Sequence, residues 1–198
     1  MKRILAALLL LTLAAPASGQ DFEKGLRAYE QRDYATALSE WRPLAEQGNI
    51  DAQYRLGMAY AGGHGVPQDY AKAAKWHQKA AEQGQARAQT FLGGLYHYGR
   101  GVPQDYAEAV KWYRKAAEQG RARAQALLGN MYAEGKSVPQ DFVLAHKWLN
   151  LAASDAENRN VTVKMRDIIA KLMTPDQIAE AQRLAREWMA AFEKRKKK

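Results

Sequence analysis

Cysteine is absent from the 198-residue sequence, which excludes disulfide bridges, thiol catalysis and cysteine-ligated metal sites. Proline is scarce, at six residues, while 47% of the residues are hydrophobic. This composition supplies enough apolar material for one packed domain or one short repeat array. Long apolar runs are also scarce, because the most apolar stretch covers about eleven residues, well short of the roughly 20 that a membrane-spanning helix needs.

That apolar stretch, residues 4–14, belongs to a segment organised like a secretory signal peptide. Two basic residues precede it, and small residues follow it up to Gly19. We therefore expect residues 1–19 to form a signal peptide, with cleavage after Gly19 or Ala17, and the mature protein to be periplasmic or secreted. An uncleaved membrane anchor is the alternative. Removal of the two basic residues would lower the formal net charge from +9 to +7, so the mature chain stays basic.

The dominant feature of the sequence is an internal repeat with a period of 36 residues. Residues 52–87 align with residues 88–123 without a gap, and 24 of the 36 positions are identical. A third copy follows at the same offset. The register is marked by Gly57, Gly93 and Gly129, by Tyr60, Tyr96 and Tyr132, and by Trp76, Trp112 and Trp148. A fixed period of this length is typical of solenoid proteins.

Each repeat is predicted to contain two helices, at about 52–61 and 70–82 in the first copy. On the first helix, Leu56 and Tyr60 lie one turn apart and belong to a buried face. Gly57 lies inside this helix, where glycine costs about 1 kcal/mol relative to alanine. Its return in every copy therefore predicts the close approach of a neighbouring helix.

The turn between the helices and the end of the second helix carry signals of their own. A Gly-x-Gly-Val-Pro segment allows unusual backbone angles and then stops the first helix. Asp69, Asp105 and Asp141 follow it and are predicted to cap the second helices, each contributing roughly 1 kcal/mol. Gly84 and Gly120 are predicted to end the second helices in the left-handed conformation.

Three motifs connect these repeats to a known family: Ala-x-x-x-Leu-Gly-x-x-Tyr, Gly-x-Gly-Val-Pro-x-Asp and Ala-x-x-Trp-x-x-x-Ala-Ala-x-x-Gly. They resemble the Sel1-like repeat family, which is related to tetratricopeptide repeats, over residues 50–154. The resemblance implies right-handed superhelical stacking of helix pairs, and proteins that mostly act as adaptors or envelope regulators. We therefore predict an all-α fold, an α/α superhelical solenoid of tandem helix-turn-helix repeats with three repeats in this range.

The segments on either side depart from the repeat and are expected to cover its ends. Residues 20–49 look like a tetratricopeptide-type unit with a shortened turn, so we expect an N-terminal capping helix pair. Residues 155–193 are expected to form C-terminal capping helices. The first of these carries apolar residues at Val161, Met165, Ile168, Ile169 and Leu172. The second is predicted to begin at Thr174, with a proline and an acid in its first turn.

No motif of a metal or nucleotide site is complete. Gly135-Lys136-Ser137 imitates the end of a phosphate-binding loop, but Asn130 stands where that loop needs glycine. The histidines form no pair at metal-binding spacing, these residues being His64, His77, His97 and His146. His77 has Tyr113 and Leu149 as its counterparts, which predicts a packing role. We expect no cofactor and no metal.

An enzyme is the alternative that the resemblance raises. Some cysteine-rich relatives are associated with penicillin binding or hydrolysis, so a beta-lactamase or penicillin-binding protein has to be considered. A serine enzyme of that kind needs a Ser-x-x-Lys pair, and none of Ser39, Ser137 and Ser154 has lysine three residues on. The cysteines of those relatives are absent as well. We therefore expect a non-catalytic scaffold.

A binding surface is predicted where the repeats differ from one another. Core positions of stacked repeats must recur, whereas outward positions on the first helices are free to vary. The resemblance implies that the first helices line the concave side of the superhelix. We predict that a protein or peptide partner contacts this side through Tyr54, Arg55, Met58, His97, Tyr98, Asn130 and Glu134. Unconstrained solvent-facing residues are the alternative for each of them.

The end of the sequence is a basic tail, consisting of Lys194, Arg195, Lys196, Lys197 and Lys198. Such a run is usually solvated and frayed. It provides a second hypothesis, an envelope-associated protein that docks on anionic membrane or polysaccharide, with an affinity that falls as salt screens the charge. Nucleic acid is not expected as a partner, because an exported protein meets little of it.

Overall fold

The computed structural model describes residues 21–155 and 159–197, so the predicted signal peptide and Lys198 lie outside the described residues. Within those two ranges the chain is all-α, with ten helices and no strand, which confirms the predicted fold class. The helices are α1 (Phe22–Glu30), α2 (Tyr34–Glu46), α3 (Ile50–Gly62), α4 (Tyr70–Glu82), α5 (Ala86–Tyr98), α6 (Tyr106–Glu118), α7 (Ala122–Glu134), α8 (Phe142–Ala152), α9 (Arg159–Ala170) and α10 (Pro175–Lys196).

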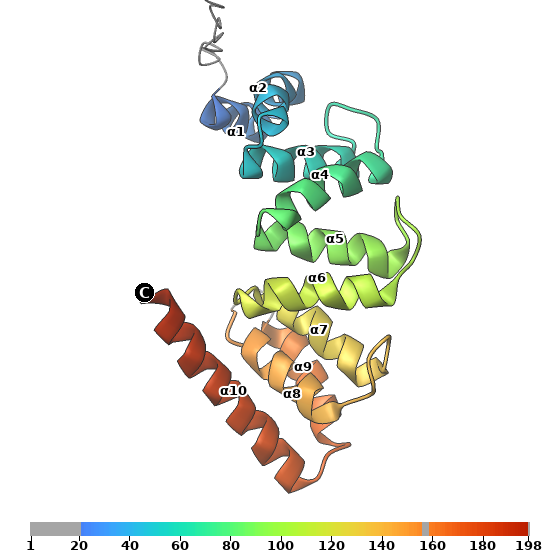
Figure 1. Cartoon of the computed structure of the whole chain (residues 1–198), viewed down its shortest axis with the longest axis vertical. Coiled ribbons are helices and arrows are strands. Elements are labelled where there is room, and N and C mark those ends of the chain that lie inside the picture. The colour runs from blue at the N-terminus through green and yellow to red at the C-terminus, as the bar shows by residue number, and fades with distance from the viewer. Residues whose placement is uncertain (1–20, 156–158, 198) are drawn as a thin grey trace, which may run out of the picture.

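The helices stack in chain order along one long axis, from α1 and α2 at one end to α8 and α9 at the other (Figure 1). The three repeats are the pairs α3–α4, α5–α6 and α7–α8. The last helix leaves this order: α10, red in Figure 1, runs back along one side of the stack, and its C-terminal end lies near the level of α6. The stack is therefore an elongated solenoid with a returning helix on its flank.

The predicted caps of the second helices are confirmed. The carboxylates of Asp69, Asp105 and Asp141 accept hydrogen bonds from backbone amides in the first turns of α4, α6 and α8. At the other end of α4 and α6, Gly84 and Gly120 have φ angles of +93° and +82°, as the left-handed ending requires. These boundaries are set by local chemistry that recurs in every repeat.

A glutamine closes the turn between the two helices of each repeat. The side-chain amides of Gln68, Gln104 and Gln140 donate to carbonyls at the end of the preceding helix, at 2.7 to 2.8 Å. Ser137 takes a positive φ of 55° in the third turn, where Gly65 and Gly101 have 71° and 72°. The third turn therefore has the same shape as the other two.

The glycine inside each first helix lies directly against the second helix of the same repeat. A Cβ atom on Gly57 would lie 2.6 to 2.7 Å from the His77 ring, and one on Gly93 would lie 2.7 Å from the Tyr113 ring. On Gly129 it would lie 2.9 Å from Cγ of Leu149. The predicted close approach is confirmed, and the facing side chain is His, Tyr or Leu in turn.

Buried glutamines connect each repeat to the next. Gln53, Gln89 and Gln125 donate to carbonyls at the end of the preceding second helix, at 3.0 to 3.2 Å. Gln83 and Gln119 add 2.8 Å bonds to Gln53 and Gln89. Because these groups are buried or partly buried and mutually paired, they hold the repeats in register at little desolvation cost.

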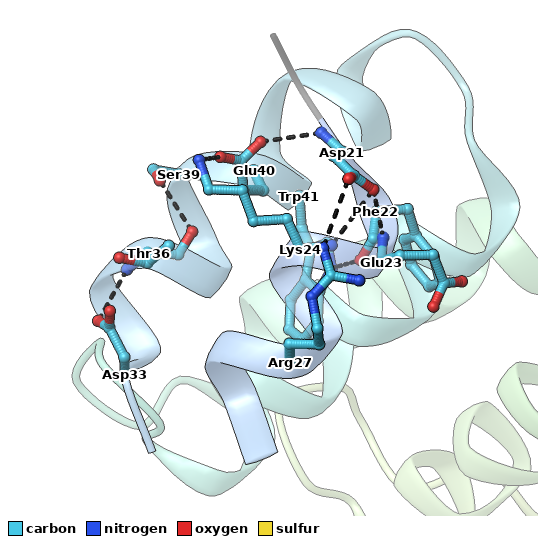
Figure 2. Close-up of polar contacts among 10 residues, drawn as sticks. All are labelled: Asp21, Phe22, Glu23, Lys24, Arg27, Asp33, Thr36, Ser39, Glu40 and Trp41. Atoms are coloured by element: carbon cyan, nitrogen blue, oxygen red, sulfur yellow. Dashed lines mark hydrogen bonds and ion pairs between the residues drawn. The ribbon is translucent and has the colours of Figure 1, made fainter. Parts of the chain in front are cut away.

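The N-terminal pair α1–α2 is held by one partly buried ion pair and one buried tryptophan (Figure 2). Glu40, only 6% exposed, accepts hydrogen bonds from Nζ of Lys24 at 2.6 Å and from the backbone amide of Asp21 at 2.9 Å. These bonds, the lysine's above all, lower the pKa of the Glu40 carboxyl. Trp41 is fully buried and packs against Gly25, where a Cβ would meet its ring.

At the other end, α9 and α10 both pack against α8. Ile169 and Met165 of α9 join the core beside Leu149, but the other apolar residues of this helix do not. Val161 and Ile168 of α9 are 69% and 55% exposed, and Leu172, which follows the helix, is 62% exposed. The predicted apolar set therefore divides into a buried and an exposed part.

The returning helix α10 begins as predicted, at a capping box formed by Thr174 and Gln177. Its buried side contributes Trp188, whose ring lies 5.9 Å from that of Trp148, and Phe192, whose ring packs on Gly120. The helix continues to Lys196, beyond residue 193 where we expected it to end. Among the described residues no helix is long and apolar enough to cross a membrane.

Candidate functional site

A cavity of about 160 Å³ opens on the surface formed by the first helices α3, α5 and α7, which we call the first-helix face. Its centre lies on α5, in the middle repeat, and its rim reaches the repeats before and after it. The lining residues are Ala61, Tyr70, Thr90, Phe91, Gly94, Leu95, Tyr98, Arg100, Tyr113, Arg123 and Leu127. Ligand pockets for drug-sized molecules are about 300–1,000 Å³, so this cavity fits one side chain rather than a whole ligand.

The cavity lies where α5 has a glycine and the neighbouring first helices have larger residues. Gly94 occupies the position of Met58 in the first repeat and of Asn130 in the third. A Cβ on Gly94 would have one near neighbour, the Tyr113 hydroxyl at 3.8 Å, which is an ordinary contact. The space above Gly94 is therefore open, in contrast to the space above Gly93, which the Tyr113 ring fills.

Aromatic rings form the walls, and other rings support them from behind. Phe91 is stacked on the buried His77 with ring centres 5.0 Å apart, and Tyr54 contacts both. Tyr98, 59% exposed, lies against the ring of His97 with centres 4.5 Å apart. Because the rings are held by other rings, the walls of the cavity are set by packing rather than by flexible chains.

Two arginines stand at the rim. The guanidinium of Arg100 lies 5.7 Å from the centre of the Tyr70 ring and 5.4 Å from that of Tyr98. The guanidinium of Arg123 lies 5.9 Å from the centre of the Phe91 ring. Both contacts are of the cation–π kind. The cavity therefore combines an apolar interior with two positive charges at its edge.

The hydroxyl of Tyr113 is a polar group on the inner wall. Tyr113 is fully buried, and its oxygen has no hydrogen-bond partner among the described residues. Burial raises the pKa of this phenol, with Tyr98 adding to the shift and Arg123 opposing it. The phenol is therefore protonated at neutral pH and available to donate a hydrogen bond to an occupant of the cavity.

The structure brings together only part of the predicted partner-binding set at this cavity. Tyr98 lines it, while Tyr54 and His97 support its walls from behind. Burial lowers the pKa of His97, and the charge of Lys136 lowers it further against an opposing effect of Glu134. His97 therefore stays largely neutral at pH 7.

The other four predicted residues lie elsewhere on the same face. Arg55 contacts the Trp41 ring at 6.0 Å, toward the N-terminal pair. Glu134 forms a 2.6 Å ion pair with Lys136. Met58 and Asn130 are partly buried at the positions that correspond to Gly94, and the side-chain oxygen of Asn130 has no partner among the described residues. The assignment of these seven residues to a partner stays a prediction.

The sequence does not assign Arg100, Arg123, Tyr70 or Tyr113 to a binding surface, and it predicts a packing role for Tyr113. These residues come from a turn, from the start of the next first helix and from two second helices, so no single helical face contains them. One signal was available: Gly94 is a second glycine inside a helix, next to the packing glycine, at a position where the other copies have side chains.

A second hollow, of about 300 Å³, lies between α10 and the body of the solenoid. Its lining residues are Gly120, Gln125, Leu151, Ser154, Trp188, Met189, Phe192, Glu193 and Lys196. It is the seam along which the returning helix packs. No group of three or more His, Asp or Glu residues in the described ranges is arranged to hold a metal ion.

Comparisons with known proteins agree with this architecture. The Sel1 repeat model matches residues 50–85, 86–120 and 122–156. A Sel1 repeat protein from Oxalobacter formigenes is similar, with a TM-score of 0.67 and 37% sequence identity over 70% of this chain and 57% of that one. So is c5321, a protective antigen present in uropathogenic Escherichia coli strains that displays an SLR fold, with a TM-score of 0.60 and 29% identity over 89% and 47% of the two chains.

The chain thus spans about half the length of these two similar structures. None of the curated proteins matches it significantly. The three matched segments coincide with the pairs α3–α4, α5–α6 and α7–α8, so the sequence repeat, the structural repeat and the family model agree in register.

Proposed function

Because the chain belongs to the Sel1 repeat family, we propose that it is a periplasmic scaffold that binds a protein or peptide on its first-helix face. Proteins built from these repeats are generally non-catalytic scaffolds for protein–protein interaction. The observation that carries the proposal is the cavity of the middle repeat, where Gly94 leaves open a space that Met58 and Asn130 occupy in the neighbouring repeats.

The site is suited to binding rather than to reaction. Its polar side chains carry the guanidiniums of Arg100 and Arg123, three phenols and one hydroxyl, that of Thr90, which donates to the Ala86 carbonyl oxygen. No described carboxylate, serine or cysteine lines the cavity. A general base or nucleophile with a partner in hydrogen-bond reach is what acyl-transfer chemistry requires. The arrangement supports recognition of a side chain, with aromatic walls for apolar contact and arginines for orientation.

Site-specific photocrosslinking in cells tests the proposal. A photoreactive amino acid at Tyr98 is expected to capture a defined partner, because this side chain is exposed at the cavity. The matched control carries the same photoreactive residue at Lys79, which is exposed on the second helix of the first repeat. Equal capture from both positions, or none from Tyr98, would show that the first-helix face is not the binding surface.

Localisation in the periplasm is supported by the composition of residues 1–19, a basic start followed by an apolar run and small residues. Expression of the full chain in a Gram-negative host, with osmotic-shock fractionation and mass spectrometry of the N-terminus, tests this. Recovery in the shock fluid with a new N-terminus after Ala17 or Gly19 is expected. Retention of the intact chain in the cytosol would contradict it.

Docking on an anionic surface is the second candidate, supported by the position of the basic residues at the end of α10. Lys194, Arg195 and Lys196 are exposed in the last turn of this helix. Deletion of residues 194–198 is expected to abolish sedimentation with anionic lipid vesicles at low salt. Unchanged sedimentation of the truncated chain would exclude the tail as the docking element.

A further inference from the structure

The two arginines at the cavity lack acidic partners. Neither Arg100 nor Arg123 forms an ion pair or a side-chain hydrogen bond with another described residue, and both guanidiniums lie over aromatic rings instead. Some arginines of the described chain do pair with acids, as Arg183 does with Glu180 and Glu187. The cavity rim therefore has two guanidinium groups with their donors free for a ligand.

The inner wall of the cavity adds another hydrogen-bond donor. The Tyr113 hydroxyl is buried without a partner on the inner wall, and a protonated phenol donates to an anionic oxygen. A buried polar group without a hydrogen bond is costly, so an occupant that accepts from this hydroxyl is favoured over a purely apolar one. The Tyr113 hydroxyl of α6 thus lines the cavity together with two guanidiniums, that of Arg123 from α7 and that of Arg100 from the turn after α5.

We propose that the cavity binds the carboxylate of a glutamate side chain in an acidic segment of the partner, a refinement that rests on the function proposed above. The glutamate methylenes contact Leu95, Leu127 and the Phe91 ring. Its carboxylate accepts hydrogen bonds from the guanidiniums of Arg100 and Arg123 and from the Tyr113 hydroxyl. Charge-assisted bonds of this kind are roughly twice as strong as neutral ones.

A side chain within a segment, rather than a chain end, fits the position of the cavity. Its lining extends from Ala61 of the first repeat to Leu127 of the third, so the first-helix face continues on both sides of it. A bound segment can therefore run across the opening in both directions. The formal net charge, +9 for the full chain and +7 without residues 1–19, favours an acidic partner over a basic one.

The test uses the ¹⁵N-labelled full chain and a short peptide probe titrated in an NMR experiment. The probe is N-acetylated and C-amidated, with one central glutamate flanked by alanine and leucine residues. Saturable shifts are expected for the amides of Thr90, Gly94 and Leu127 and for the Nε–H signals of the two arginines. The peptide with glutamine in place of glutamate is expected to bind about tenfold more weakly.

A matched pair of variants isolates the guanidinium. Arg123→Gln is expected to weaken binding of the glutamate peptide about tenfold. Arg87→Gln removes the same charge at the equivalent position of the preceding first helix, outside the cavity lining, and is expected to change binding by less than about twofold. Thermal unfolding of both variants checks that the fold is retained.

Several results would overturn the proposal: no saturable shift with the glutamate peptide, equal binding of the glutamine peptide, or equal weakening by the two arginine variants. Tighter binding of a glutamine peptide with a free C-terminus would assign the site to a chain end, and tighter binding of a phosphoserine peptide would assign it to phosphate. If the peptides fail while Tyr98 still captures a partner by crosslinking, the scaffold function stands and the glutamate assignment alone is wrong.

Discussion

The middle repeat and its two neighbours have the same frame but different surfaces on their first helices. Gly57, Gly93 and Gly129 recur because a second helix lies against each of them, whereas the next residue is Met58, Gly94 or Asn130. Two adjacent glycines of α5 therefore have opposite environments. The Tyr113 ring fills the space beside Gly93, whereas the space above Gly94 is open. Positions that recur in all three repeats are therefore set by packing between helices. Positions that differ between the repeats lie on the surface that can specialise for binding.

Substitutions at the two adjacent glycines, Gly93 and Gly94, are expected to differ most in their effect on stability. Gly93→Val is expected to destabilise the protein by about 3 kcal/mol or more, because its side chain would overlap the Tyr113 ring and approach the Ala109 carbonyl oxygen. Gly94→Val, one residue further on, is expected to cost less than about 1 kcal/mol. Chemical denaturation of both variants measures the difference, and equal losses would show that the two glycines are not distinct.

The repeats also differ in the residue that faces the packing glycine, which is a histidine only in the first repeat. Burial lowers the pKa of His77 from 6.5 to about 4, and neither ring nitrogen has a partner among the described residues. The unfolded chain therefore binds more protons than the folded protein between these pH values. The free energy of unfolding is expected to fall as the pH drops from 6.5 to 4, by up to about 3 kcal/mol from this residue.

The variant His77→Leu, which places the residue of the third repeat in the first, is expected to remove this part of the pH dependence. Urea unfolding of both proteins at several pH values between 4 and 7 measures it. The wild type should lose stability more steeply than the variant toward low pH. Parallel curves would contradict a buried, neutral His77.

A smaller effect is expected from Gly94→Ala. Its Cβ has only an ordinary contact with the Tyr113 hydroxyl, at 3.8 Å, and alanine favours the helix. A gain of about 0.5–1 kcal/mol is therefore expected. Gly84→Ala is the control with the opposite sign, because Gly84 has a φ of +93° that alanine tolerates poorly. A loss of stability in Gly94→Ala would mean that the space above Gly94 is filled.

Much of the frame could be predicted from the sequence, because it depends on local chemistry that recurs three times. The second helix predicted at 70–82 coincides with α4, and the first helix predicted at 52–61 lies within α3, Ile50–Gly62. The carboxylate caps and the close-packed glycines were identified for the same reason. A capping carboxylate bonds to its own helix, and a packing glycine contacts one fixed neighbouring helix. The spacing of these residues in the sequence is therefore enough to predict both contacts.

The cavity and the ends could not be predicted in the same way, because they depend on how elements from different repeats meet. Arg100 and Arg123 lie on either side of the cavity from a turn and from the next repeat, and no periodicity connects them. Val161 and Ile168 are exposed because α10 packs on α8 and not over these two residues. The spacing of apolar residues within α9 does not predict where α10 packs.

Partner capture by the variant Gly94→Met tests whether the middle repeat carries the binding site. This substitution gives the middle repeat the residue of the first repeat and fills the cavity, while its Cβ makes only an ordinary 3.8 Å contact with the Tyr113 hydroxyl. With the photoreactive residue at Tyr98, the variant is expected to keep the helical circular dichroism and thermal stability of the parent protein but to lose capture of the partner. Undiminished capture by a stably folded Gly94→Met protein would contradict the claim that the middle repeat carries the binding site.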